Sequence, residues 1–389
     1  MPAPIPYWRL SSFYFWYYAA LGGFTPYFAQ WLHDRGQDAM AISLIFGLWY
    51  GTRILAPMSW NALAARSPHP MRWLRSGAAL TLLCFSAFLF ANGFLALAAV
   101  MACFSFFCNA ILPQFETLTL DTLHGRRENY GRIRLWGSIG FIAATLAFGW
   151  LIKRHGSVGL PLWMLPLYAL TAIAAFANHA PPEGLHPHEA APRGWAALKR
   201  PDVLLFLAVA MLMQIGFGPY YVFFTLHLGE HGHGADTIGL LWSLGVLAEI
   251  GIFLIAPSLL RRHSSLKLWQ ICLGLTVLRW AATALIPGSL PAMFALQLLH
   301  AASFGVFHAC AMQLISAYFP GKQMAQGQAL LYAASSGIGG VLGALFAGIA
   351  WKAGGGMACF GFGALATLAG LLLALRLRLP ASHTSQRPA

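Results

Sequence analysis

The sequence predicts an all-α membrane protein of about twelve transmembrane helices in two similar six-helix bundles. Of the 389 residues 58% are hydrophobic and only 9% are charged, whereas soluble domains carry about 25% charged residues. Apolar runs of span length recur along nearly the whole chain, and landmarks of the first half return in the second. These runs do not alternate between apolar and polar residues, which excludes the strands of a membrane β-barrel.

The expected spans are the apolar runs of about 20 residues, the length that crosses a bilayer core. The first run is of span length, rich in Trp and Tyr and without a small-residue cleavage site, so we expect it to be a retained helix and not a signal peptide. In chain order the spans are 8–32, 38–60, 71–91, 95–119, 133–153, 158–178, 202–229, 236–260, 266–286, 291–317, 324–350 and 356–377.

The longest polar stretch divides the chain near its middle. It contains four prolines, three histidines and several basic residues, which is typical of a linker. The predicted organisation is an N-terminal six-helix bundle over 1–178, a cytoplasmic linker over 179–200, a C-terminal six-helix bundle over 201–378 and a cytoplasmic tail over 379–389.

The two halves share short matches in the same order. The segment Gly23–Tyr27 (GFTPY) is echoed by Gly216–Tyr220 (GFGPY). Asp38, Gly47, Pro57, Gly149 and Lys153 return as Asp236, Gly245, Pro257, Gly348 and Lys352. Because all these offsets fall between about 193 and 200 residues, the sequence predicts an internal duplication of one six-helix unit.

The net charge of +13 is explained by topology. About seventeen of the 24 Lys and Arg fall on one side of the membrane if the N-terminus is cytoplasmic. This asymmetry follows the positive-inside rule, so we expect a multi-pass protein of the bacterial inner membrane with both termini in the cytoplasm. A nucleic-acid partner is therefore not expected.

Motifs for catalysis, metals or nucleotides are not found. The six cysteines lie in apolar runs and form no CxxC pair, which favours small buried side chains over a disulfide framework or a metal site. No phosphate loop, nucleophile elbow or zinc-helix motif occurs. We expect no enzyme activity and no cofactor, with a proton gradient as the energy source.

Ionisable side chains inside the spans are the main functional candidates, because each is expensive there unless it is paired or hydrated. Glu116 lies near the cytoplasmic end of the fourth span and Arg134 one turn into the fifth. A short hairpin would bring them together, and a guanidinium offers forked donors to a polar solute. A purely structural ion pair is the alternative.

A second group of candidates lies in the second half. Glu249 is the carboxylate well inside this half. Desolvation favours the protonated form of such a group, whereas a nearby cation favours its ionised form, and a proton carrier has to balance these two effects. His300 and His308 are eight residues apart, about 12 Å along a helix and on similar faces. Both are candidates for proton coupling together with Arg279, although hydrogen-bonding histidines of a helix bundle are the alternative.

Four aromatic residues, Tyr27, Tyr220, Tyr221 and Trp136, are candidates for stacking on a substrate ring. Most of the other aromatics are expected to face lipid or to form the interfacial belts.

Several segments carry a resemblance to a known family. The run Tyr130–Ser138 (YGRIRLWGS), the run Leu241–Val246 followed by Glu249, and the motifs around Arg279 and His300 resemble the major facilitator superfamily. The resemblance covers nearly the full length. It is strongest to the phenylpropionate permease group and more distant to lactose permease-type oligosaccharide/proton symporters.

The resemblance implies roles for individual residues. Glu116 and Arg134 match the substrate-binding carboxylate and arginine of the sugar permeases, with the same spacing of eighteen. Arg279 and His300 match the arginine and histidine of their proton-coupling network. That network's lysine and proton-carrying glutamate are replaced here by Gln297 and Ser303, so the wiring of this site is expected to differ.

The resulting expectation is a monomeric proton symporter that imports a small organic solute by alternating access. The resemblance implies an aromatic acid such as phenylpropionate as the substrate, and the excess of intramembrane arginine agrees with an anion. Import of an oligosaccharide or a nucleoside, and drug or metabolite efflux by the same fold, are the alternatives. A sensor that binds a solute without moving it is another.

Overall fold

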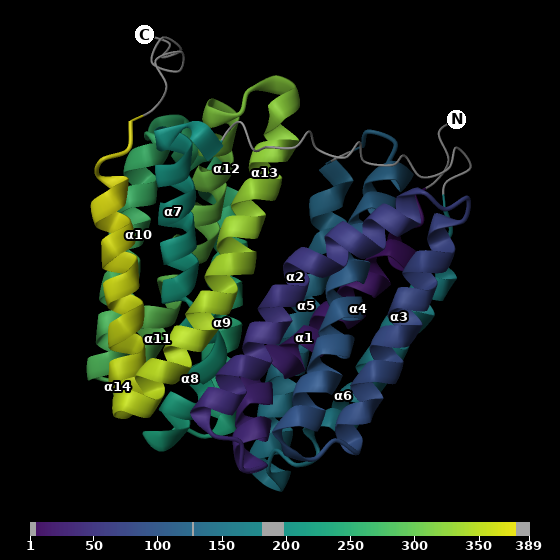
Figure 1. Ribbon diagram of the computed structural model, residues 1–389, viewed down its shortest axis with the longest axis horizontal. Coiled ribbons are helices and arrows are strands. Elements are labelled where there is room, and N and C mark those ends of the chain that lie inside the picture. The colour runs from purple at the N-terminus through teal and green to yellow at the C-terminus, as the bar shows by residue number, and fades with distance from the viewer. Residues whose placement is uncertain (1–4, 127, 181–197, 379–389) are drawn as a thin grey trace. The chain divides into compact units, whose positions relative to one another are not determined.

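The computed structural model describes residues 5–126, 128–180 and 198–378. In these residues the chain is helical and contains no strand, as Figure 1 shows. Nine helices of this part are long and apolar enough to cross a membrane. Most of the predicted linker and the predicted tail lie outside the described residues, at 181–197 and 379–389.

The chain folds as two compact units. Unit 1 comprises Met1–Glu189 and His233–Ser243, and unit 2 comprises Ala190–Gly232 and Leu244–Ala389. In unit 1, α1 packs mainly against α5 and α6, and α2 packs against α4. The helices of this unit are α1 (Tyr7–Asp34), α2 (Ala39–Ala65), α3 (Pro70–Ser86), α4 (Gly93–Thr122), α5 (Glu128–His155) and α6 (Leu160–Ala177).

The start of α9 belongs to unit 1. Lys153 Nζ at the end of α5 donates to Asp236 Oδ2 at 2.7 Å, and the Tyr27 hydroxyl lies 3.2 Å from Ala235 O. These contacts hold the first turns of α9 against α1 and α5.

Unit 2 contains more helix breaks than unit 1. Its π-helical segments η3 and η5 interrupt the predicted tenth and eleventh spans. In chain order its elements are α7 (Pro201–Gly216), α8 (Gly218–Glu230), α9 (Ala235–Arg262), α10 (Ser265–Leu285), α11 (Leu290–Leu298), η3 (Ala301–Val306), α12 (Phe307–Tyr318), α13 (Met324–Tyr332), η5 (Ala333–Gly339) and α14 (Gly340–Ala374).

Two predicted span boundaries differ from the observed elements. The seventh span breaks at Phe217 because Pro219 has no N–H to donate to a preceding carbonyl. The predicted end of the eleventh span and start of the twelfth both lie within α14, in which the non-helical residues Gly354 and Gly355 separate two helical stretches. Gly355 has a φ of +63°, which glycine adopts without steric cost. Each predicted span corresponds to one helix, to part of one or to consecutive helical elements.

Equivalent helices of the two units pack through glycine in the same way. A Cβ at Gly140 of α5 would lie 2.2 Å from Phe15 O of α1. A Cβ at Gly339, which ends η5, would lie 2.9 Å from Met211 O of α7. Small residues let helix backbones approach this closely in a membrane, and the offset between the two glycines, 199 residues, agrees with the predicted repeat.

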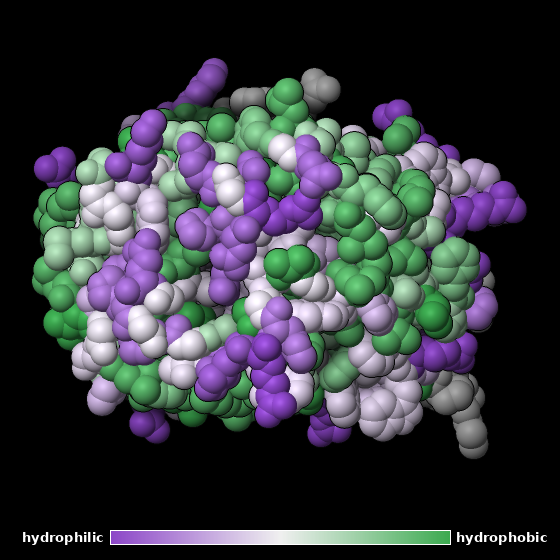
Figure 2. Space-filling model, turned by 90° about the horizontal axis from the view of Figure 1, so that it is seen from below, coloured by the Kyte–Doolittle hydropathy of each residue, from purple (hydrophilic) through white to green (hydrophobic). Residues whose placement is uncertain are grey.

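The surface of the molecule has the hydropathy pattern of a protein in a bilayer. Seen end-on from below in Figure 2, hydrophilic side chains gather on the end face, whereas hydrophobic ones are abundant along its margin. Large apolar side chains that are more than half exposed include Leu254, Leu278 and Leu365 within the membrane-length helices.

Candidate functional site

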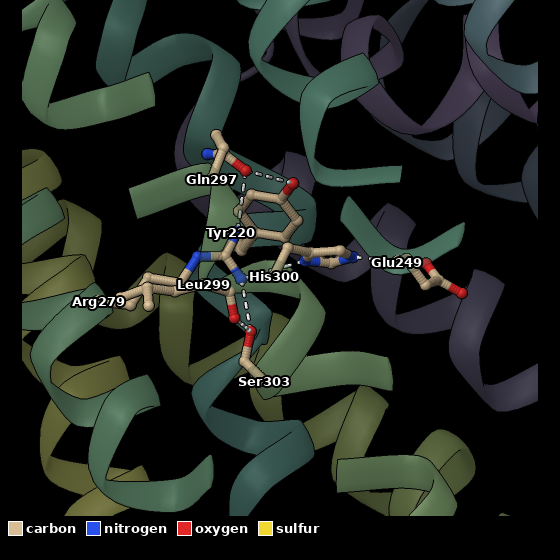
Figure 3. Close-up of polar contacts among 7 residues, drawn as sticks. All are labelled: Tyr220, Glu249, Arg279, Gln297, Leu299, His300 and Ser303. Atoms are coloured by element: carbon tan, nitrogen blue, oxygen red, sulfur yellow. Dashed lines mark hydrogen bonds and ion pairs between the residues drawn. The ribbon is translucent and has the colours of Figure 1, made fainter. Parts of the chain in front are cut away.

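A fully buried arginine is the centre of the polar cluster in unit 2. Arg279 of α10 is 0% exposed, and its guanidinium contacts three side chains that follow one another at intervals of three residues. Nη2 donates to Gln297 Oε1 at 3.0 Å, and Nη1 donates to Ser303 Oγ at 2.9 Å and lies 3.1 Å from His300 Nδ1. Figure 3 shows these contacts converging on the guanidinium.

Two aromatic side chains also contact the guanidinium of Arg279. The guanidinium lies 4.7 Å from the ring centre of Tyr220 and 4.5 Å from that of Trp280, which gives favourable cation–π contacts. The Tyr220 hydroxyl donates to Gln297 Oε1 at 3.3 Å. In the described part of the chain Arg279 forms no direct ion pair, so neutral groups hold a buried cation here.

His300 connects this cation to a carboxylate. Its Nε2 lies 3.8 Å from Glu249 Oε2 on α9, on the other side of the ring from Arg279 (Figure 3). Arginine can only donate, so His300 Nδ1 must accept, and the neutral ring carries its proton on Nε2. The imidazole therefore presents an N–H towards Glu249, whose side chain is 23% exposed.

The backbone explains why these groups meet. A Cβ at Gly245 of α9 would lie 3.3 Å from Gln297 Oε1 and 3.4 Å from His300 Cγ, so the absence of a side chain there lets α9 approach the cluster. Next to His300 the chain enters the π-helical turn η3, in which Ser303 Oγ also donates to Leu299 O at 2.9 Å. Such π-helical turns occur frequently at functional sites.

Two other predicted residues of this half lie beside the cluster. His308 stacks on Phe304 at 6.5 Å, and Phe304 stacks on His300 at 5.5 Å. The three rings thus form a column along the helix, and His308 does not bond to Arg279. Tyr221 stacks on Phe217 at 5.5 Å, next to Tyr220.

A second charged cluster lies in unit 1 around Arg134 of α5. The guanidinium lies 3.9 Å from the ring centre of Tyr18 and 5.6 Å from that of Tyr14, both on α1. Arg134 Nη2 also donates to the Tyr18 hydroxyl. Gly137 makes room for this contact, since a Cβ there would lie 2.8 Å from both the guanidinium and the Tyr18 ring.

Glu116 belongs to the same region without a direct ion pair to Arg134 among the described residues. Its Oε1 accepts from the Tyr130 hydroxyl at 3.4 Å, and the Tyr14 hydroxyl donates to Thr119 Oγ1 one turn further along α4. The predicted carboxylate and arginine therefore face a shared set of tyrosines. This arrangement offers a cation, an acceptor and aromatic rings to a ligand.

The remaining predicted substrate residues lie elsewhere in unit 1. The Tyr27 hydroxyl, on a side chain that is 0% exposed, donates to Thr145 O at 2.9 Å. Trp136 Nε1 donates to the Tyr7 hydroxyl at 3.0 Å. Two residues of α-helix correspond to a rotation of about 200°, so Trp136 leaves α5 on the side opposite Arg134.

Sequence reasoning did not assign roles to several residues that bind the two arginines. Gln297 and Ser303 were recognised only as departures from a family pattern, yet both bind Arg279. Their spacing of three residues on either side of His300 was a usable signal. Tyr18 carried no comparable signal, because it lies in a run of aromatic residues.

No group of three or more His, Cys, Asp or Glu is placed to hold a metal ion in the described ranges 5–126, 128–180 and 198–378. The histidine-rich segment 230–233 (EHGH) lies within these ranges. His227 and His231 are adjacent at 4.8 Å between ring centres, but they form only a pair.

Buried, hydrogen-bonded charges inside membrane-length helices are typical of a transport protein. Residues 7–362 match the model of the family described as "MFS_1 like family". The chain therefore belongs to this family and is a secondary transporter of the major facilitator superfamily.

Two curated relatives are similar over most of their length. The chain is 30% identical to the "Probable 3-phenylpropionic acid transporter" of Escherichia coli (strain K12), over 88% of this chain and 90% of that one. It is 28% identical to the "Maltose permease" of Geobacillus stearothermophilus, over 94% and 93% of the two chains.

A solved structure supports the fold. The crystal structure of the nucleoside transporter NupG matches with a TM-score of 0.82 at 16% identity, covering 95% of this chain and 98% of that one. The prediction of an all-α membrane protein with the major facilitator fold is thereby confirmed.

Proposed function

We propose that the protein is a proton symporter that imports a small aromatic acid of the phenylpropionate type. The observation that carries this proposal is the chain of contacts from buried Arg279 through His300 to Glu249. The similarity to the phenylpropionic acid transporter supports the substrate class.

In this proposal Glu249 carries the proton. His300 is held neutral because the guanidinium of Arg279 donates to its Nδ1 and repels a second positive charge. Glu249 is the more exposed member of the pair, at 23% against 7%, so it exchanges protons with water more readily. Protonation of Glu249 removes a negative charge near the buried cation Arg279. The equilibrium between two conformations then shifts towards the one that binds the proton more tightly.

The carboxylate of the substrate binds Arg134 in this proposal. The guanidinium provides forked donors for a carboxylate, and Tyr18 and Tyr14 provide aromatic faces beside it. The protein acts as a monomer in the bacterial inner membrane with both termini in the cytoplasm, in agreement with the distribution of Lys and Arg.

Uptake by proteoliposomes tests this function. A gradient with the interior alkaline is imposed, and accumulation of radiolabelled 3-phenylpropionate is measured with and without a protonophore. A weak acid also accumulates passively along such a gradient, so protein-free liposomes are the necessary baseline. Accumulation faster than this baseline and saturable in substrate supports the proposal, whereas uptake equal to the baseline contradicts it.

A neutral hydroxylated solute is the second candidate. The maltose permease relative favours it, as does Glu116, whose carboxylate can accept from sugar hydroxyls. Competition of maltose and uridine against 3-phenylpropionate separates the two substrate classes. Inhibition by maltose or uridine at lower concentration than by unlabelled aromatic acid would favour this alternative.

Efflux by the same fold is tested separately. Vesicles are loaded with substrate, a proton gradient of the opposite direction is imposed, and release of the substrate is measured.

A further inference from the structure

A groove on unit 1 is separate from both charged clusters. It lies between the first turns of α1 and α5 and has a volume of about 330 Å³. Its lining residues are Trp8, Ser11, Ser12, Phe15, Trp16 and Trp136. The four aromatic side chains make it a predominantly apolar site.

The aromatic walls of this groove are fixed by packing and by hydrogen bonds. The rings of Trp8 and Trp136 lie 5.4 Å apart, and those of Phe15 and Trp136 lie 6.4 Å apart. Trp136 is oriented by its hydrogen bond to Tyr7, whose hydroxyl lies 3.4 Å from Arg132 O. A site whose walls are already ordered binds a ligand at a smaller entropic cost.

One polar group of the lining has no partner. Ser11 is 2% exposed, and its hydroxyl makes no hydrogen bond within the residues that the structure describes. The neighbouring Ser12 hydroxyl, by contrast, donates to Arg9 O at 2.9 Å. A buried hydroxyl without a partner is costly, which points to a ligand with an acceptor at this position.

Two arginines lie one helical turn before lining residues of the groove. Arg9 and Arg132 are both exposed. Arg9 precedes Ser12 by three residues and Arg132 precedes Trp136 by four, so each arginine lies on the same helix face as a lining residue, one turn nearer the helix start. The ligand that fits has an apolar body, an acceptor oxygen beside it and an anionic group at one end.

We propose that this groove binds an anionic phospholipid. One acyl chain lies against the four aromatic residues, an ester carbonyl accepts from Ser11, and the phosphate lies between Arg9 and Arg132. The bilayer supplies this ligand at high local concentration, tryptophan is favoured at the level of the headgroups, and basic residues next to a span attract anionic lipid.

Native mass spectrometry of the full chain in detergent tests the proposal, with dioleoyl-phosphatidylglycerol and dioleoyl-phosphatidylcholine as the probes. We expect wild-type protein to retain one phosphatidylglycerol at a concentration at which phosphatidylcholine is lost. The double variant R9Q/R132Q should weaken retention of phosphatidylglycerol by roughly tenfold or more, because two surface cations are removed. Equal retention of the two lipids by the wild type overturns the proposal.

A matched control is R66Q/R72Q, which removes the same charge from two other exposed arginines. It should retain phosphatidylglycerol like the wild type; a loss equal to that of R9Q/R132Q would mean that only net charge matters and would overturn the site.

Ser12→Phe fills the groove without changing charge, and its folding is checked by thermal unfolding in lipid-free detergent. Folded Ser12→Phe protein that still retains the lipid at wild-type strength overturns the placement of the acyl chain.

Discussion

Glu249 Oε2 lies 3.8 Å from Nε2 of His300, whose other ring nitrogen is bound by the guanidinium of a buried arginine. The geometry fixes the direction of the imidazole, because its Nδ1 has to accept. The N–H of the neutral ring therefore points towards the carboxylate.

Glu249→Gln should abolish proton-driven accumulation while leaving exchange of substrate across the membrane. The amide keeps the shape and a hydrogen-bonding oxygen but cannot take up a proton. The rate above the protein-free baseline should fall by roughly tenfold or more, a barrier change of ~1.4 kcal/mol, in the radiolabelled uptake assay. Counterflow of preloaded substrate measures exchange.

Glu128→Gln is the control for this substitution. Glu128 is an exposed carboxylate at the start of α5, and its removal should leave accumulation unchanged. Full accumulation by Glu249→Gln would remove this residue from the mechanism.

His300→Gln should retain proton coupling, whereas His300→Ala should not. A glutamine can accept from Arg279 through its oxygen and present its amide N–H to Glu249, as the neutral imidazole does. We expect uptake within about tenfold of the wild type for Gln, the equivalent of ~1.4 kcal/mol, with the same dependence on pH. Complete loss with Gln would show that the imidazole itself titrates.

Arg279→Lys should destabilise the protein although it conserves the charge. A lysine ammonium cannot reproduce the planar fork that binds Gln297 and Ser303 together. Buried acceptors left without donors cost about 1–3 kcal/mol, which should appear as a lower thermal unfolding temperature in detergent. Lys267→Arg, at the start of the same helix outside the cluster, is the control; equal stability of Arg279→Lys and the wild type would contradict the network.

Tyr18→Phe should raise the KM for an aromatic acid moderately, and Tyr18→Leu should raise it further. The first change removes the hydroxyl that accepts from Arg134, worth about 0.5–1.5 kcal/mol or roughly 2–10-fold. The second also removes the ring over which the guanidinium lies. Tyr332→Phe, on a half-exposed side chain of α13, serves as the control. A KM unchanged in both variants would place the substrate elsewhere.

Gly140→Ala should lower the free energy of unfolding by about 1–3 kcal/mol, the usual effect of overpacking. The new methyl group would lie 2.2 Å from Phe15 O, a backbone atom that cannot move aside alone. Gly131→Ala on the same helix has no atom within 4 Å and should be neutral or stabilising. Thermal unfolding of the two purified variants decides the comparison; equal stability would argue against close packing of α1 on α5.

Helix positions and the two-half organisation follow from local properties of the chain. The length of an apolar run decides whether a segment spans a bilayer, so each of the twelve predicted spans corresponds to one helix, to part of one or to consecutive helical elements. The breaks at Phe217 and in η3 were not predicted. Proline and π-helical turns change a few backbone hydrogen bonds without changing the hydropathy that marks the span.

The sequence by itself identified Arg279 and His300, which the fold buries, because charge inside an apolar run is rare and visible; it did not single out His227, which is buried as well. Which of the ionisable residues meet was decided by the tertiary structure: Glu249, Arg279 and His300 lie on three different elements and join where Gly245 lets α9 approach. Helix rotation likewise separates Trp136 from Arg134 and directs it to the lipid groove. Such contacts depend on the packing of helices distant in the chain, which composition and spacing alone do not determine.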